Sequence, residues 1–65
     1  MLIAQVLNFS GLLPAGLARK ANINEGTISR WRSGKQKIDR GYLYILYYTF
    51  ENNSMIKNML KSELY

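Results

Sequence analysis

The sequence predicts a small all-α domain of five short helices, in which the second and third helices form a helix-turn-helix. Apolar residues recur at helical spacing along most of the chain. Asn24 and Gly34 bracket one of these segments, and they are the residue types that commonly precede and follow a helix. The chain has 65 residues, which is the size of one small domain, so we expect a single domain over 1–65.

The first helix is expected over residues 2–9. Its apolar residues, spaced to face the core, are Leu2, Ile3, Val6 and Leu7. The dipeptide Ser10-Gly11 that follows is typical of a helix end.

The helix-turn-helix is expected over residues 14–33. Pro14 suits the first position of the second helix, which ends near Ala21 with Leu17, Ala18 and Ala21 on one face. Asn22 is expected in a left-handed turn, and Asn24 is expected to cap a third helix over 25–33. Ile28 and Trp31 share one face of that helix, so burying both faces requires the two helices to cross steeply.

Residues 42–50, YLYILYYTF, suit two kinds of structure. Their aromatic and β-branched composition is typical of a strand. Asp39 would instead cap a helix that begins at Arg40, although a helix so apolar all round would need cover on more than one side. A final helix is expected over 54–64, with Met55, Ile56, Met59 and Leu60 on one side.

The net charge of +5 is concentrated in one part of the chain. Residues 19–40 contain seven basic and two acidic residues, which gives +5, while Lys57 and Lys61 balance Glu51 and Glu63 elsewhere. Excess charge focused on a groove-sized element indicates a polyanionic partner. The basic residues are Arg19, Lys20, Arg30, Arg32, Lys35, Lys37 and Arg40.

The composition also argues against several functions. The chain has no histidine, no cysteine, four carboxylates and no phosphate-binding glycine loop, so we expect no enzyme, metal site or cofactor. Residues 1–18 carry no charged side chain, but polar residues, glycines and a proline interrupt them. They barely reach spanning length and lack a basic start, so neither a membrane segment nor a secretory signal is expected.

The stretch LARKANINEGTISRWRSGK resembles the phage repressor and Cro family of helix-turn-helix proteins. The resemblance covers about residues 13–38. Leu17-Ala18 matches the family's Leu-Ala pair, and Ile28 matches its buried aliphatic residue. The family usually has glycine where this chain has Asn22, and a phosphate-binding polar residue where it has Pro14. The resemblance implies a λ-repressor-like fold and therefore favours a helix over 42–50, with a strand as the alternative.

The resemblance assigns DNA contacts to the third helix and the loop after it. Base contacts are implied for Glu25, Gly26 and Arg30, of which Arg30 has the fork that suits the O6 and N7 of guanine. The phosphate contacts implied by the same motif are Thr27, Ser33, Lys35, Lys37 and Arg40. Trp31 is expected in the core.

The expected function is sequence-specific binding of double-stranded DNA by a transcriptional regulator. A homodimer would place the third helix of each copy in the major groove of a palindromic operator, paired through Tyr47, Tyr48 and Phe50. The family implies a cytoplasmic location, in a bacterial or phage-infected cell and at the nucleoid. A phage activator or an antitoxin-type regulator is an alternative role. A protein-interaction module that docks through 42–50 is an alternative class.

Overall fold

The computed structural model describes residues 2–65, and this part of the chain is all-helical, with five helices and no strand. The helices are α1 (Leu2–Ser10), α2 (Pro14–Ala21), α3 (Glu25–Ser33), α4 (Arg40–Thr49) and α5 (Ser54–Leu64). The predicted all-α fold class is confirmed. The strand considered for 42–50 is wrong, because these residues lie in and directly after α4.

The helix boundaries follow from local capping. Asn22 lies in the left-handed region at φ 56°, and it ends α2. The side-chain oxygen of Asn24 accepts a hydrogen bond from the Gly26 N–H at 2.7 Å, which starts α3. Gly34, at φ 80°, ends α3, where a residue without a side chain is favoured.

The last two helices begin in the same way. Asp39 accepts a hydrogen bond from the Tyr42 N–H at 3.1 Å, so its carboxylate caps α4. The side chain of Asn53 accepts one from the Ile56 N–H at 3.2 Å and caps α5. The expected cap at Asp39 is therefore confirmed, and Asn53 is a cap that was not predicted.

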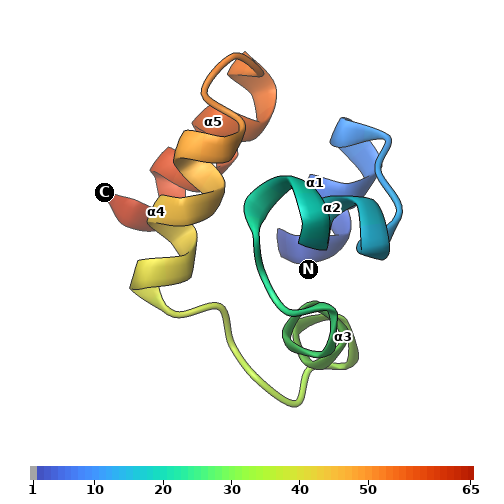
Figure 1. The fold of residues 1–65 in the computed structure, drawn as a ribbon. Helices are drawn as coiled ribbons and strands as arrows, with labels where there is room; N and C mark the ends of the chain where they lie inside the picture. The colour runs from blue at the N-terminus through green and yellow to red at the C-terminus, as the bar shows by residue number, and fades with distance from the viewer. Residues whose placement is uncertain (1) are drawn as a thin grey trace.

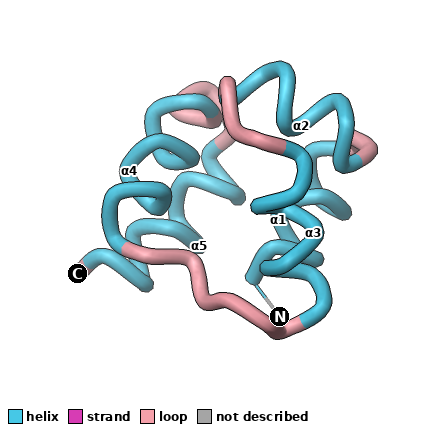
Figure 2. Tube along the Cα trace, turned by 60° about the horizontal axis from the view of Figure 1, so that its bottom comes forward, coloured by secondary structure: helices cyan, strands magenta, loops and turns pink. Residues whose placement is uncertain are grey.

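The helices form two groups around a shared core. Figure 1 shows α4 and α5 side by side, α1 and α2 together on another side, and α3 seen nearly along its axis below them. Every helix contributes to the core, whose most completely buried side chains are Ile3, Val6, Leu17, Ile28, Leu46, Ile56 and Leu60. The long connection from α3 to α4 runs along the edge of the molecule (Figure 2).

Two residues differ in burial from what the sequence predicts. The spacing groups Met55 with Ile56, Met59 and Leu60 on one side of α5, but the Met55 side chain is 53% exposed, whereas Ile56 and Leu60 are fully buried. Phe50, predicted at a dimer surface, is only 5% exposed and belongs to the core. It follows the last turn of α4, where the chain bends toward α5.

No helix in residues 2–65 has the length and apolarity needed to cross a membrane.

Candidate nucleic-acid interface

The turn between α2 and α3 fixes how α3 is presented. Ile23 lies between the two asparagines and is 6% exposed, so it anchors the turn in the core. Its N–H donates to the Ala18 carbonyl at 2.9 Å. This role of Ile23 was not predicted, although an apolar residue between two turn-forming asparagines is a usable signal of such an anchor.

α3 has one buried and one exposed face. Ile28 and Trp31 are 0% and 2% exposed, as the sequence predicted, and they pack in the same core as Leu17 and Ala21 of α2. The opposite face is exposed, and its residues are Glu25, Ser29, Arg30, Arg32 and Ser33. This face therefore offers two arginines to a partner and only one acid.

On that exposed face, the side chain of Arg30 is held by two hydrogen bonds. Its Nε–H donates to Oε1 of Gln36 at 2.9 Å, and its Nη2 donates to Oγ1 of Thr27 at 3.1 Å. A guanidinium has five N–H groups, so three of them, two on Nη1 and one on Nη2, have no hydrogen-bond partner within residues 2–65. The arginine therefore keeps a fork of donors while its position is fixed by two neighbours.

Gly26 lies under this guanidinium. A Cβ atom at Gly26 would stand 2.9 Å from the cap oxygen of Asn24 and 3.6 Å from Nη1 of Arg30. The Gly26 N–H is already bonded to Asn24. Gly26 thus has neither a side chain nor a free N–H to offer a base, and its position indicates that it makes room for the cap.

Thr27, expected to contact a phosphate, is buried in the structure. Its side chain is 6% exposed and its hydroxyl oxygen accepts the hydrogen bond from Arg30. It lies beside Ile28 on the inner face of the helix, so its position suits support of Arg30 rather than contact with a phosphate. Glu25 and Ser33 are exposed, and the Ser33 hydroxyl donates to the Arg30 carbonyl at 3.1 Å.

The loop after α3 is folded back onto the helix end. The N–H groups of Lys35 and Gln36 both donate to the carbonyl of Arg30, at 3.0 and 3.3 Å. Both Lys35 and Lys37 are exposed, so the loop holds two cations next to the exposed face of α3. We call Arg30, Arg32, Lys35 and Lys37 together the basic surface.

Arg40 has a partner of its own. One Nη2 N–H donates to the carbonyl of Leu64 at 2.9 Å, which ties the start of α4 to the end of α5. A cation at this place also suits the carbonyl end of a helix. Arg40 remains exposed, but its guanidinium is partly committed to a structural contact.

The residues expected at the dimer surface differ in how far their side chains are exposed. Tyr48 is 64% exposed, whereas Tyr47 is half-buried, with the Lys57 ammonium 5.7 Å from its ring centroid. Their rings meet edge to face at 5.6 Å. Tyr44 and Ile45 are also exposed, at 36% and 42%.

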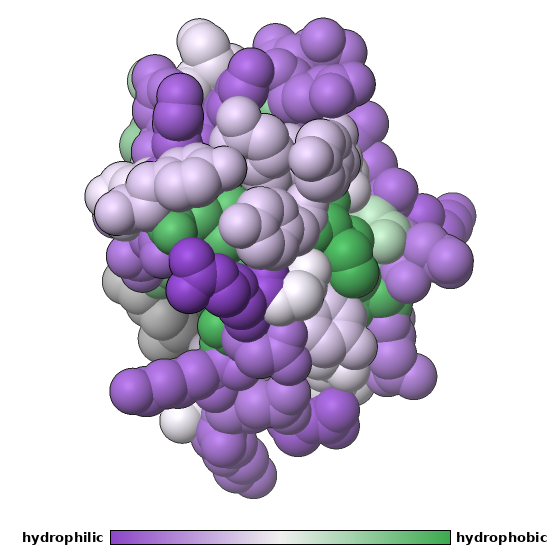
Figure 3. All heavy atoms as spheres, turned by 90° about the vertical axis from the view of Figure 1, so that its left-hand side faces the viewer, coloured by the Kyte–Doolittle hydropathy of each residue, from purple (hydrophilic) through white to green (hydrophobic). Residues whose placement is uncertain are grey.

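Tyr44, Ile45 and Tyr48 form an exposed stripe along α4, which we call the α4 stripe. Figure 3 views the molecule from the side of α4 and shows near-neutral and apolar residues gathered across its middle. The lower part of the same view is strongly hydrophilic. The α4 stripe lies on α4, whereas the residues of the basic surface lie on α3 and the loop after it, so the two surfaces come from different elements.

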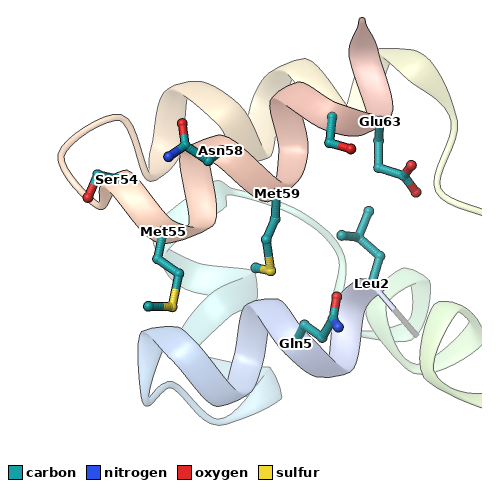
Figure 4. Close-up of a pocket in the computed structure, with 8 residues that line it drawn as sticks. Leu2, Gln5, Ser54, Met55, Asn58, Met59 and Glu63 are labelled. Atoms are coloured by element: carbon teal, nitrogen blue, oxygen red, sulfur yellow. The ribbon is translucent and has the colours of Figure 1, made fainter.

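A groove of about 780 Å³ lies between α1 and α5. In Figure 4, Met55 and Met59 point from α5 toward α1, and Met59 lies opposite Gln5. None of its lining residues comes from α2, α3 or the loop after α3. The groove therefore does not contribute to the basic surface.

No group of three or more metal-ligating side chains gathers in the part of the chain that the structure describes. Comparison with known proteins gives no match: no family model, no curated protein and no solved structure is significantly similar to this chain.

Proposed function

We propose that this protein binds double-stranded DNA sequence-specifically as a transcriptional regulator, with α3 in the major groove. One observation carries the proposal. The exposed face of α3 presents Arg30, held by two hydrogen bonds and with three N–H groups that have no partner within residues 2–65, next to a loop that exposes Lys35 and Lys37. Residues 26–38 contain no acid, so this surface attracts a polyanion along its whole length.

The dimensions of α3 support a major-groove site. An α-helix with its side chains is about 10–12 Å in diameter, and the major groove is about 12 Å wide, so α3 would fit with its exposed side chains toward the base edges. Arg30 would then read a guanine through O6 and N7, while Lys35 and Lys37 would contact phosphates. Glu25, which is exposed in the first turn of α3, would accept a hydrogen bond from a cytosine amino group.

The size of the chain supports binding as a homodimer. Its largest principal extent is 26 Å, whereas successive major grooves on one side of DNA lie about 34 Å apart. One copy therefore reads one half-site. Two copies related by a two-fold axis would read a palindromic operator, and we propose that they pair on the α4 stripe, which is exposed and uncharged.

Selection of bound sites from random duplex DNA tests this function. We expect an enriched palindromic sequence with a guanine at a fixed place in each half-site. Affinity for it should fall steeply with salt, because each phosphate contact releases counterions. If the selection enriches no sequence, and the protein binds all duplexes with the same weak affinity, the proposal is overturned.

A protein-interaction module is the second candidate, and the exposed α4 stripe favours it. Such a module would bind a partner protein through apolar contacts, and its affinity would hardly depend on salt. The salt dependence of binding therefore separates the two candidates.

A further inference from the structure

We propose that Gln36, which lies in the loop after α3, is a specificity-determining residue that positions Arg30. The inference rests on the proposed function. Gln36 holds the Arg30 guanidinium in one orientation, so that its Nη1 and Nη2 atoms face a guanine. Gln36 itself need not touch a base.

The contacts of Arg30 form a closed arrangement between helix and loop. The Arg30 Nε–H donates to the Gln36 side chain at 2.9 Å, and the Gln36 N–H donates back to the Arg30 carbonyl at 3.3 Å. Lys35 donates to the same carbonyl at 3.0 Å, which keeps the loop in place without any help from the arginine side chain. The side-chain oxygen of Gln36 therefore belongs to a loop whose backbone is held in place independently of the Arg30 side chain.

Thr27 holds the guanidinium from the other side. Its hydroxyl oxygen accepts a hydrogen bond from the Nη2 N–H at 3.1 Å. With the hydrogen bond to Thr27 alone, the guanidinium could still rotate about that hydrogen bond. Gln36 adds a second, separate point of attachment at Nε, so the two bonds together define the plane of the guanidinium.

This positioning has a consequence for recognition. A free arginine on a DNA-facing helix can bond a guanine, or it can swing to the nearest phosphate, which carries no sequence information. With Nε and one N–H of Nη2 engaged, Nη1 and the second N–H of Nη2 are the donors left to meet the two acceptors of guanine. A preorganised fork also loses less freedom on binding.

The test compares Gln36→Leu, which removes the acceptor but keeps the approximate length, with Gln5→Leu as the matched control. Gln5 is an exposed glutamine on α1, far in sequence from the basic surface. Each variant is measured against the selected duplex and against the same duplex with the guanine of the half-site replaced. We expect Gln36→Leu to reduce the preference for guanine about tenfold and Gln5→Leu to leave it unchanged.

A double-mutant cycle with Arg30→Ala separates positioning from direct contact. Once Arg30 is absent, Gln36→Leu should change neither the affinity nor the preference further. If the two effects add, or if Gln36→Leu weakens binding to every duplex equally, Gln36 contacts DNA itself and the inference is overturned.

A measurement on the free protein makes the inference testable apart from DNA binding. The Arg30 Nε–H resonance in a ¹⁵N correlation spectrum should exchange slowly with water in the parent and in Gln5→Leu, and rapidly in Gln36→Leu. Equal exchange in parent and Gln36→Leu would overturn the inference even if DNA binding is intact. A slowly exchanging Nε–H in a protein that prefers no duplex sequence would instead overturn the proposed function, and the recognition role of Gln36 with it.

Discussion

The ring of Trp31 meets the ring of Tyr42 edge to face, with centroids 5.1 Å apart and planes at 74°. Trp31 belongs to α3 and Tyr42 to α4, so this contact joins the helix of the basic surface to the α4–α5 pair. Trp31 is 2% exposed, and its Nε1–H is buried with no hydrogen-bond partner in residues 2–65. The tryptophan thus contributes packing area rather than polar contacts.

Substitution of Trp31 tests this assignment. Trp31→Ala should lower the free energy of unfolding by about 3–5 kcal/mol, which is much of what a domain of this size has. Trp31→Phe keeps an aromatic ring near Tyr42 and removes the unpaired N–H, so its cost should be much smaller. Urea denaturation followed by circular dichroism measures both. Equal losses for the two variants would contradict a role in packing.

Gly26 should resist the substitution that usually stabilises a helix. Replacing a helical glycine by alanine normally gains about 1 kcal/mol. At Gly26 the new Cβ would stand 2.9 Å from the Asn24 cap oxygen, so Gly26→Ala should destabilise the protein by disturbing that cap. Gly16→Ala is the control, because its Cβ would meet Leu12 at an ordinary 3.5 Å and should stabilise. A gain of thermal stability in both variants would argue against the cap as the constraint.

Arg30→Ala should remove a base contact. We expect a loss of about 1–3 kcal/mol on the selected duplex and a relaxed preference at one base pair of each half-site. Arg32→Ala is the control, since it removes the same charge from another exposed position of α3. Competition binding against duplexes varied one base pair at a time distinguishes them. An equal loss on all duplexes would make Arg30 a phosphate contact only.

Lys35 and Lys37 should contribute affinity without sequence preference. Lys35→Gln and Lys37→Gln should each reduce the slope of log affinity against log salt by about one for every phosphate that the protein no longer neutralises, and by about two in a dimer. Lys61→Gln, on the exposed side of α5, should leave the slope unchanged. Fluorescence anisotropy at several salt concentrations gives the slopes. Coincident slopes for the loop variants and the parent would mean that these lysines do not touch DNA.

The α4 stripe should mediate dimerisation. Tyr48 is 64% exposed, so Tyr48→Glu should leave the fold intact and shift the sedimentation equilibrium toward monomer. Phe50→Glu serves as the contrast, because Phe50 is 5% exposed and a buried carboxylate should unfold the domain. A parent that stays monomeric at high concentration and binds one half-site with full affinity would contradict this prediction.

The ends of most helices are encoded locally and can be predicted from the amino-acid order. The caps at Asn24 and Asp39 and the left-handed residues Asn22 and Gly34 depend on neighbours within one helical turn, so their chemistry is visible in a short stretch of sequence. The buried face of α3, with Ile28 and Trp31, follows from spacing. The basic surface was predictable because its charges are close together along the chain.

The partners of individual side chains on that surface depend instead on how the helices pack. Arg30 meets Gln36 six residues away, and Arg40 meets the carbonyl of Leu64 twenty-four residues away, through contacts that no periodic pattern encodes. Phe50 and Tyr48 are both aromatic and lie two positions apart, yet one is buried and the other exposed. A helix as apolar on all sides as α4 has no intrinsic inner face, so only its packing against α2 and α5 selects which residues stay on the surface.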